Sequence, residues 1–227
     1  MPWIQNGINT INPADLGVLR TAGAELREGL KPLPMIDATL NINEKFSLET
    51  FYQFIFRHTE IEPEGTFLSQ NDFASPGGNS VFFGFGNPAI PDSPDNLFGA
   101  GQVNEALAPI GAVVRRGNDR DAKDEGQFGF ALRYFEPALN DTEFGFYWTH
   151  LHSRLPVLSA QAGTPTGLAS GDYASTANYF REFPESLDTL GVSFNTVVPS
   201  SGTALQGEFS YAIDRPLQVD EVELLFA

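Results

Sequence analysis

Residues 46–57 read FSLETFYQFIFR, and this stretch decides the fold. Its even positions begin with Phe46 and Leu48 and are mostly apolar, whereas its odd positions begin with Ser47 and Glu49. A period of two is typical of a β-strand with one apolar and one polar face. The stretch also has about the length that a tilted strand needs to cross a bilayer.

The same alternation recurs along the chain. Residues 35–43 place Ile36, Leu40 and Ile42 on one face, and the pair Glu44-Lys45 makes a two-residue turn into the stretch quoted above. These two segments therefore predict a β-hairpin. The further alternating segments are 127–134, 143–149, 190–195 and 205–211.

The connections between these segments alternate in length. The short ones are 44–45, 137–141 and 199–202, and the long ones are 58–125 and 154–185. In an up-and-down meander this order places all short turns at one end of the strands, as in bacterial outer-membrane barrels. We therefore predict an all-β fold: an antiparallel up-and-down transmembrane β-barrel, partial with about six strands, with short periplasmic turns and long extracellular loops.

The rest of the chain is interpreted as part of one partial barrel domain spanning 1–227. Residues 1–34 are predicted to form a loop or plug segment with a short helix that starts near Asn12 and Pro13. About six strands are too few to close a barrel. We therefore expect either an internal piece of a longer protein or an assembly of several copies. The first residues lack the features of a signal peptide, which agrees with an internal piece or a mature form.

The composition excludes several classes of protein. The net charge of −16 offers no basic patch for nucleic acid, and the absence of Cys excludes disulfides and thiolate metal sites. No uninterrupted apolar run approaches the ~18 residues of a transmembrane helix. The chain holds 20 Phe, 6 Tyr and 2 Trp, and a barrel can present such rings to lipid without burying them against protein.

The polar face of the alternating segments supplies the candidate site. Facing away from the apolar rows, its charged residues would line the barrel lumen, and a mixed polar lumen is typical of a water-filled or partly plugged channel. The alternative, which we favour, is that these charges pair across strands and hold the register. The lumen candidates are Asp37, Glu49, Arg57, Arg133, Glu143 and Glu208.

Other constellations give weaker hypotheses. Phe82, Phe83 and Phe85 in the first long loop are predicted to form an apolar contact at the outer mouth. Asp119, Asp121 and Asp124 are weak candidates for a calcium site, against a solvated or salt-bridged rim; the arginines between them are alternatives for lipopolysaccharide phosphates.

No motif of a nucleophilic, phosphate-binding or zinc site is present, so we predict neither an enzyme nor a bound cofactor. His150 and His152 share a strand face and are expected near the lipid headgroups; as a metal pair they lack an evident third ligand.

Several stretches resemble one known family. The chain is similar to the Gram-negative envelope family called domain of unknown function 1302, whose members are large outer-membrane β-barrels, longer than this chain, with a signal peptide and without agreed catalytic residues. The stretches that carry the resemblance are Ile4-Gln5-Asn6-Gly7-Ile8-Asn9, Asn12-Pro13-Ala14-Asp15, Ala24-Glu25-Leu26-Arg27-Glu28, Tyr52-Gln53-Phe54, Asn71-Asp72-Phe73, Arg133-Tyr134-Phe135, Leu139-Asn140-Asp141-Thr142-Glu143, His152-Ser153-Arg154-Leu155-Pro156 and Val222-Glu223-Leu224-Leu225.

The function that fits these observations is passage of small molecules across an outer membrane. We expect a passive channel or facilitator for small apolar or amphipathic solutes, in contact with outer-membrane lipid and lipopolysaccharide in a Gram-negative bacterium. Two alternatives remain open: a structural or binding protein with a plugged barrel, and a soluble secreted all-β binding domain.

Overall fold

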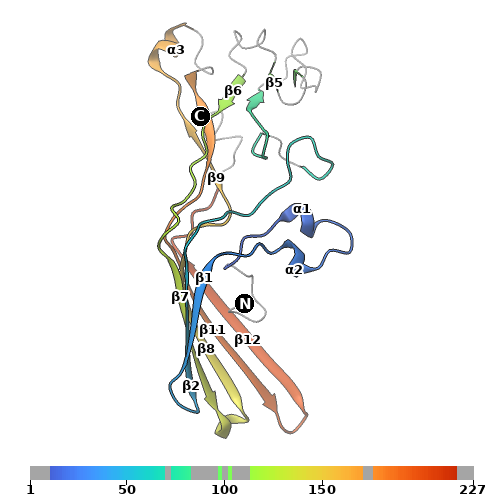
Figure 1. The fold of residues 1–227 in the computed structure, drawn as a ribbon, viewed down its shortest axis with the longest axis vertical. Helices are drawn as coiled ribbons and strands as arrows, with labels where there is room; N and C mark the ends of the chain where they lie inside the picture. The colour runs from blue at the N-terminus through green and yellow to red at the C-terminus, as the bar shows by residue number, and fades with distance from the viewer. Residues whose placement is uncertain are drawn as a thin grey trace.

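The computed structural model describes residues 11–69, 73–82, 97–98, 102–103, 113–170 and 176–218. Its main element is a six-stranded antiparallel sheet in which spatial order follows chain order (Figure 1). None of the helices in these ranges is long and apolar enough to cross a membrane. The strands of the sheet are β1 Met35–Asn41, β2 Phe46–Gln53, β7 Gln127–Glu136, β8 Thr142–Leu151, β11 Leu187–Val198 and β12 Thr203–Ile213.

This topology confirms the predicted all-β, antiparallel architecture. Neighbours in the sheet are neighbours along the chain, so the described strands lack the crossovers of a Greek-key sandwich. β1 and β12 form the two edges and do not pair with each other, so the described strands make an open sheet rather than a closed barrel.

Tight turns join the strands at one end of this sheet, the lower end in Figure 1. The side chain of Asn43 accepts hydrogen bonds from the amides of Lys45 and Phe46, at 2.8 and 2.9 Å, which fixes the first hairpin. The second turn is the 3₁₀ helix η3, Pro137–Leu139, followed by Asn140 at φ 58°. Gly202, at φ 65°, provides the left-handed backbone of the third turn.

The prediction that the second strand continues to residue 57 is wrong. β2 ends at Gln53, and the amide of Phe56 donates to an Asp124 carboxylate oxygen at 2.8 Å instead of joining a strand ladder. Phe56 is buried in a separate small cluster with Ala122 and Phe183. Long-range contacts to the two long connections therefore override the continuing alternation, and Phe56 leaves the apolar row.

The two long connections pair with each other in a second sheet. Its order is β3-β6-β10-β9, and β6 and β10 run parallel, so residues from both connections share one ladder. This sheet lies beyond the upper end of the six strands in Figure 1. Its strands are β3 Ser80–Phe82, β6 Val113–Arg116, β9 Val157–Gln161 and β10 Asn178–Glu182; β4 Leu97–Phe98 pairs with β5 Gln102–Val103, and the helix α3 is Pro165–Ser170.

The N-terminal segment 11–34 projects to one side of the sheet (Figure 1). It contains two single-turn helices, α1 Leu16–Leu19 and α2 Leu26–Gly29. The helix start predicted near Asn12 lies three residues later, because Asp15 is the cap and accepts a hydrogen bond from the Val18 amide at 3.1 Å. Asn12 instead donates to the Lys31 carbonyl at 3.2 Å and closes the segment on itself.

Candidate functional site

The two faces of the six-stranded sheet differ sharply. We call outer face the side that carries one continuous apolar row across all six strands. Several of its side chains are highly exposed, including Phe146 at 49% and Phe209 at 65%. The row consists of Leu40, Leu48, Leu132, Phe146, Val192 and Phe209.

Aromatic rings lie on both sides of this row. Toward the tight turns, Tyr134 is stacked between Phe46 and Phe144, with ring centroids 4.7 and 6.2 Å apart. Toward the long connections, Phe130 stacks on Trp148 at 5.7 Å. The outer face is therefore an aliphatic and aromatic centre between two aromatic rows.

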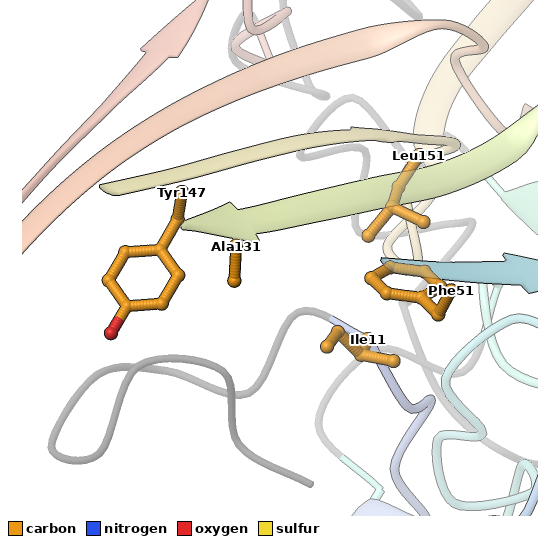
Figure 2. Close-up of a cluster of buried hydrophobic side chains, with 5 residues drawn as sticks. All are labelled: Ile11, Phe51, Ala131, Tyr147 and Leu151. Carbon is orange, nitrogen blue, oxygen red and sulfur yellow. The ribbon is translucent and has the colours of Figure 1, made fainter. Parts of the chain in front are cut away.

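The inner face is the opposite side of the same strands, and segment 11–34 packs on it. Figure 2 shows Ile11 beside Phe51, and the two belong to one buried cluster with Ala131, Tyr147 and Leu151, which come from β7 and β8. Ala131 is fully buried and Phe51 is 3% exposed. The buried core of the described sheet thus lies under the N-terminal segment and not on the outer face.

A polar clamp holds this segment in place. The Gln53 amide nitrogen donates to the Ile11 carbonyl at 2.9 Å, and the Arg154 Nη2 donates to the same carbonyl at 3.1 Å. Arg154 also donates to the Gln53 side-chain oxygen and, from Nη1, to the Arg57 carbonyl at 3.1 Å. Both clamp side chains are buried, so their hydrogen bonds are worth more than those of a solvated pair.

Arg154 lacks a carboxylate partner within the described residues. Burial lowers the pKa of its guanidinium to about 10, and its Nε has no hydrogen-bond partner. Its acceptors are neutral oxygens, so a positive charge is buried beside the inner face without neutralisation.

A cavity of about 260 Å³ adjoins this arginine. It lies between the N-terminal segment, lined there by Leu16 and Leu30, and the upper inner face, lined by Thr149 and Leu187. The described residues that line it are Asn12, Ala14, Leu16, Leu30, Thr59, Thr149, Leu151, His152, Ser153, Arg154, Leu155, Leu187, Thr189, Ala212 and Arg215.

Some of the predicted lumen residues meet on the inner face nearer the tight turns. Arg133 lies between two carboxylates, 3.1 Å from Glu49 and 3.7 Å from Glu143. Glu208 and Glu143 line a further cavity of about 40 Å³ with Arg133. Asp37 is on the inner side of β1, opposite Phe51, and is exposed.

Arg57 does not join this set. It lies beyond the end of β2 with an exposed side chain, because the strand stops at Gln53. Its prediction as a strand residue facing a lumen is therefore wrong; it contributes its carbonyl to the clamp.

Asp119 belongs to an ion-pair network in the second sheet. Its carboxylate accepts from Arg116 Nη2 at 2.7 Å and from Arg181 Nη2 at 2.6 Å. Burial opposes ionisation of Asp119, but the hydrogen bonds from Arg116 and Arg181 outweigh it and lower its pKa to about 2. A cation at Asp119 would have to displace these guanidinium groups.

The other metal candidates are separate from Asp119. Asp121 lies 3.7 Å from His58, and Asp124 binds the Phe56 amide. In the part of the chain that the structure describes, no group of three or more His, Asp or Glu side chains is arranged to hold a metal ion.

The two neighbouring histidines do not share a site. His150 binds Asp188 at 2.9 Å on the outer side. His152 follows the end of β8, is buried, and lies 3.0 Å from both the Glu125 carbonyl and the Ser186 amide. Burial lowers the pKa of His152 and so favours the neutral ring. The hydrogen bond to the Glu125 carbonyl acts in the opposite direction but is the smaller effect.

The predicted apolar mouth lies mostly beyond the structure's description. Phe82 ends β3 in the second sheet, whereas Phe83 and Phe85 lie outside the described residues. Sequence reasoning missed Ile11, Gln53 and Arg154 as a unit, although the resemblance had singled out the stretches around two of them. The sequence pattern around a Gln or Arg at the end of a strand does not indicate that its side chain is buried.

The fold and its two faces define an all-β protein with an apolar outer face and a partly covered polar inner face. Residues 2–227 match the family model described as protein of unknown function (DUF1302), and the chain belongs to that family. Comparisons with curated proteins and with solved structures found no match.

Proposed function

We propose that the six-stranded sheet is part of the wall of an outer-membrane β-barrel in a Gram-negative bacterium. The observation that carries this proposal is the continuous apolar row across all six strands, exposed on β1, β8, β11 and β12 and half-buried on β2 and β7, opposite a face with buried polar groups. In water such a continuous apolar face is an association or aggregation hazard, whereas lipid favours it. Further strands or copies would have to pair with β1 and β12, because lipid leaves no open sheet edge.

The strand dimensions agree with this proposal. β7 and β8 each have 10 residues, which at ~3.3 Å per residue give about 33 Å. A tilt of ~45° reduces this to roughly 23 Å, close to the ~25 Å apolar band of outer-membrane barrels. The two aromatic rows are four residues apart along β7, about 9 Å along the membrane normal at this tilt, so both would lie within the apolar band.

We further propose that the barrel passes small apolar or amphipathic molecules along its inner face. The cavity between segment 11–34 and the sheet gives such a molecule a partly apolar place of contact. In this account the segment narrows the passage, and the Gln53–Arg154 clamp sets how often it opens.

The clamp also favours a second candidate, a plugged barrel with a structural or binding role. Its test is solute release from liposomes that contain the full-length protein, with and without a deletion of residues 11–34. The passage proposal expects slow release by the wild type and much faster release by the deletion. Release by the deletion alone supports the plugged barrel, and no release by either protein contradicts passage.

A further inference from the structure

The residues that line the cavity under segment 11–34 carry positive charge, whereas the whole chain is acidic. The sequence contains 29 acidic and 13 basic residues other than His, yet the lining that the described residues provide includes two arginines, Arg154 and Arg215, and no Asp or Glu. The surroundings therefore disfavour cations and favour an anion in a protein whose net charge is −16.

Arg154 is the focus of this charge. Its side chain is buried, binds only neutral oxygens and leaves Nε without a partner. Buried charges are usually paired, and a carboxylate is the group that a guanidinium binds most strongly in proteins. Arg154 is thus a buried cation that the described residues do not neutralise, which is the environment in which an anion would bind.

Several described carboxylates that flank lining residues are engaged elsewhere. Asp15 and Glu60 both pair with Lys31, and Asp188 pairs with His150. His152 lies in the lining but is held between the Glu125 carbonyl and the Ser186 amide, and its lowered pKa disfavours a further positive charge beside the two arginines.

The remaining lining is mostly aliphatic. Leu16 and Leu30 come from the N-terminal segment, and Leu151, Leu155 and Leu187 come from the sheet and its upper end. The volume of about 260 Å³ lies just below the ~300–1,000 Å³ of small-molecule sites, which favours a compact ligand.

We infer that this cavity binds a compact amphipathic carboxylate, with the carboxylate on Arg154 and the hydrocarbon part against the leucines. The inference rests on the proposed function for its biological meaning, since it names the class of solute that the inner face would take. Binding itself requires only the cavity and its arginine, so it can be measured apart from passage.

The test is calorimetric titration of the full-length protein in lipid nanodiscs with octanoate and, as the uncharged ligand of equal chain length, with 1-octanol. Empty nanodiscs supply the background. We expect saturable octanoate binding that is about tenfold or more tighter than octanol binding, since a charged hydrogen-bonded pair is lost with the alcohol. Equal affinities for the two ligands would overturn the inference.

Two variants separate recognition from support. Arg154→Gln should weaken octanoate binding about tenfold more than it weakens octanol binding, because loss of the clamp affects both ligands and loss of the charge affects only the carboxylate. Equal weakening of both ligands would mean that Arg154 only holds the cavity wall in place, which contradicts the inference. Arg27→Gln removes an equal charge from an exposed position on α2 and is the matched control that should change neither affinity.

A third variant leaves the clamp untouched. Ala212→Phe adds a ring to the lining from β12 and should abolish binding of both ligands, while the heat-modifiable mobility of the folded protein stays unchanged. Octanoate binding that survives this filling would place the ligand elsewhere and overturn the site. Liposome release reports passage separately: octanoate binding without release contradicts the proposed passage and leaves the binding site standing.

Discussion

The outer and inner faces of the six-stranded sheet are formed by alternate residues of the same strands, but they differ in how their side chains are buried. On the outer face Val192 and its row neighbours expose apolar side chains and bury little against protein. On the inner face Ala131 and Gln53 are fully buried, and both a hydrophobic cluster and a polar clamp fix segment 11–34. The contrast shows that the described sheet concentrates its specific packing on the inner face. In the barrel that we propose, the outer face would contact a surrounding apolar phase.

The largest expected effect comes from placing a charge in the outer row. Val192→Arg should lower the free energy of unfolding in lipid by about 2–4 kcal/mol, the cost of a cation near the bilayer midplane. Ser210→Arg, on the exposed inner side of β12, is the control and should cost less than about 1 kcal/mol. Equilibrium urea unfolding in vesicles measures both, and equal costs would remove the distinction between the faces.

Breaking the clamp should have the next largest effect. Gln53→Leu removes a donor to the Ile11 carbonyl and an acceptor for Arg154, so we expect a loss of about 2 kcal/mol and faster proteolysis within segment 11–34.

Gln127→Leu is a close control for this change. Gln127 pairs directly with Gln53 in the next strand and is equally buried, but its Oε1 has no partner and its Nε2 serves only the Asp124 carbonyl at 3.1 Å. Its replacement should cost less than half as much and leave segment 11–34 protected. Equal proteolysis of the two variants would show that the clamp does not hold the segment.

Two glycines that lie next to aromatic rings, one on each face, allow the packing of the two faces to be compared. A Cβ at Gly145 on the inner face would meet the Tyr147 hydroxyl and lie 2.6 Å from the Ser193 Oγ, whereas a Cβ at Gly207 on the outer face would meet the Phe194 ring. Tyr147 is buried, but Phe194 is 36% exposed and can turn outward.

Gly145→Ala should therefore cost about 1–2 kcal/mol, and Gly207→Ala less than about 0.5 kcal/mol. Urea unfolding of the two variants measures the difference. A greater cost at Gly207 would indicate that the outer face is as tightly packed as the inner one.

The charges of the inner face should show a smaller, pairwise effect. A double-mutant cycle with Glu49→Gln and Arg133→Met is expected to give a coupling of about 1 kcal/mol, since the 3.1 Å pair is only partly buried. Zero coupling, together with a changed ion preference of solute release in the liposome assay of the proposed passage, would favour a selectivity role over the cross-strand pairing that we expect.

The smallest effect should lie outside both faces, in the second sheet. Because the folded pKa of Asp119 is about 2, below its ordinary value of 3.8, its ion pairs contribute stability above pH ~4 that is lost as the pH falls toward 2. Asp119→Asn should flatten the acid limb of a stability–pH curve by about 1 kcal/mol after allowance for solvent screening. An unchanged acid limb would show that the network carries no pH-dependent stability.

The sequence was sufficient where the deciding interactions are local. The alternation in residues 35–53 predicted the first hairpin and which residues share a face, because side chains alternate along any strand. It failed where distant residues decide: β2 stops at Gln53 because Phe56 binds Asp124, and the two long connections form one sheet because β6 pairs with β10.

The same limit applies to the site. Glu49, Arg133 and Glu143 could be placed on one face by counting, and they do lie together. Arg154 could not, because its contact with Ile11 joins residues 143 positions apart and its burial depends on a segment that folds back over the sheet. A buried arginine without a carboxylate becomes visible only once its surroundings are known.

The most direct test of the two-faced sheet is a cysteine scan along β11, which the absence of native Cys makes possible without background changes. Single cysteines at positions 190 to 194 in the full-length protein, labelled with a fluorophore and placed in vesicles with brominated lipid, report lipid contact residue by residue. We predict strong quenching at Leu190, Val192 and Phe194 and weak quenching at Gly191 and Ser193. Uniformly weak quenching, with free access of a water-soluble thiol reagent at Val192, would contradict the account.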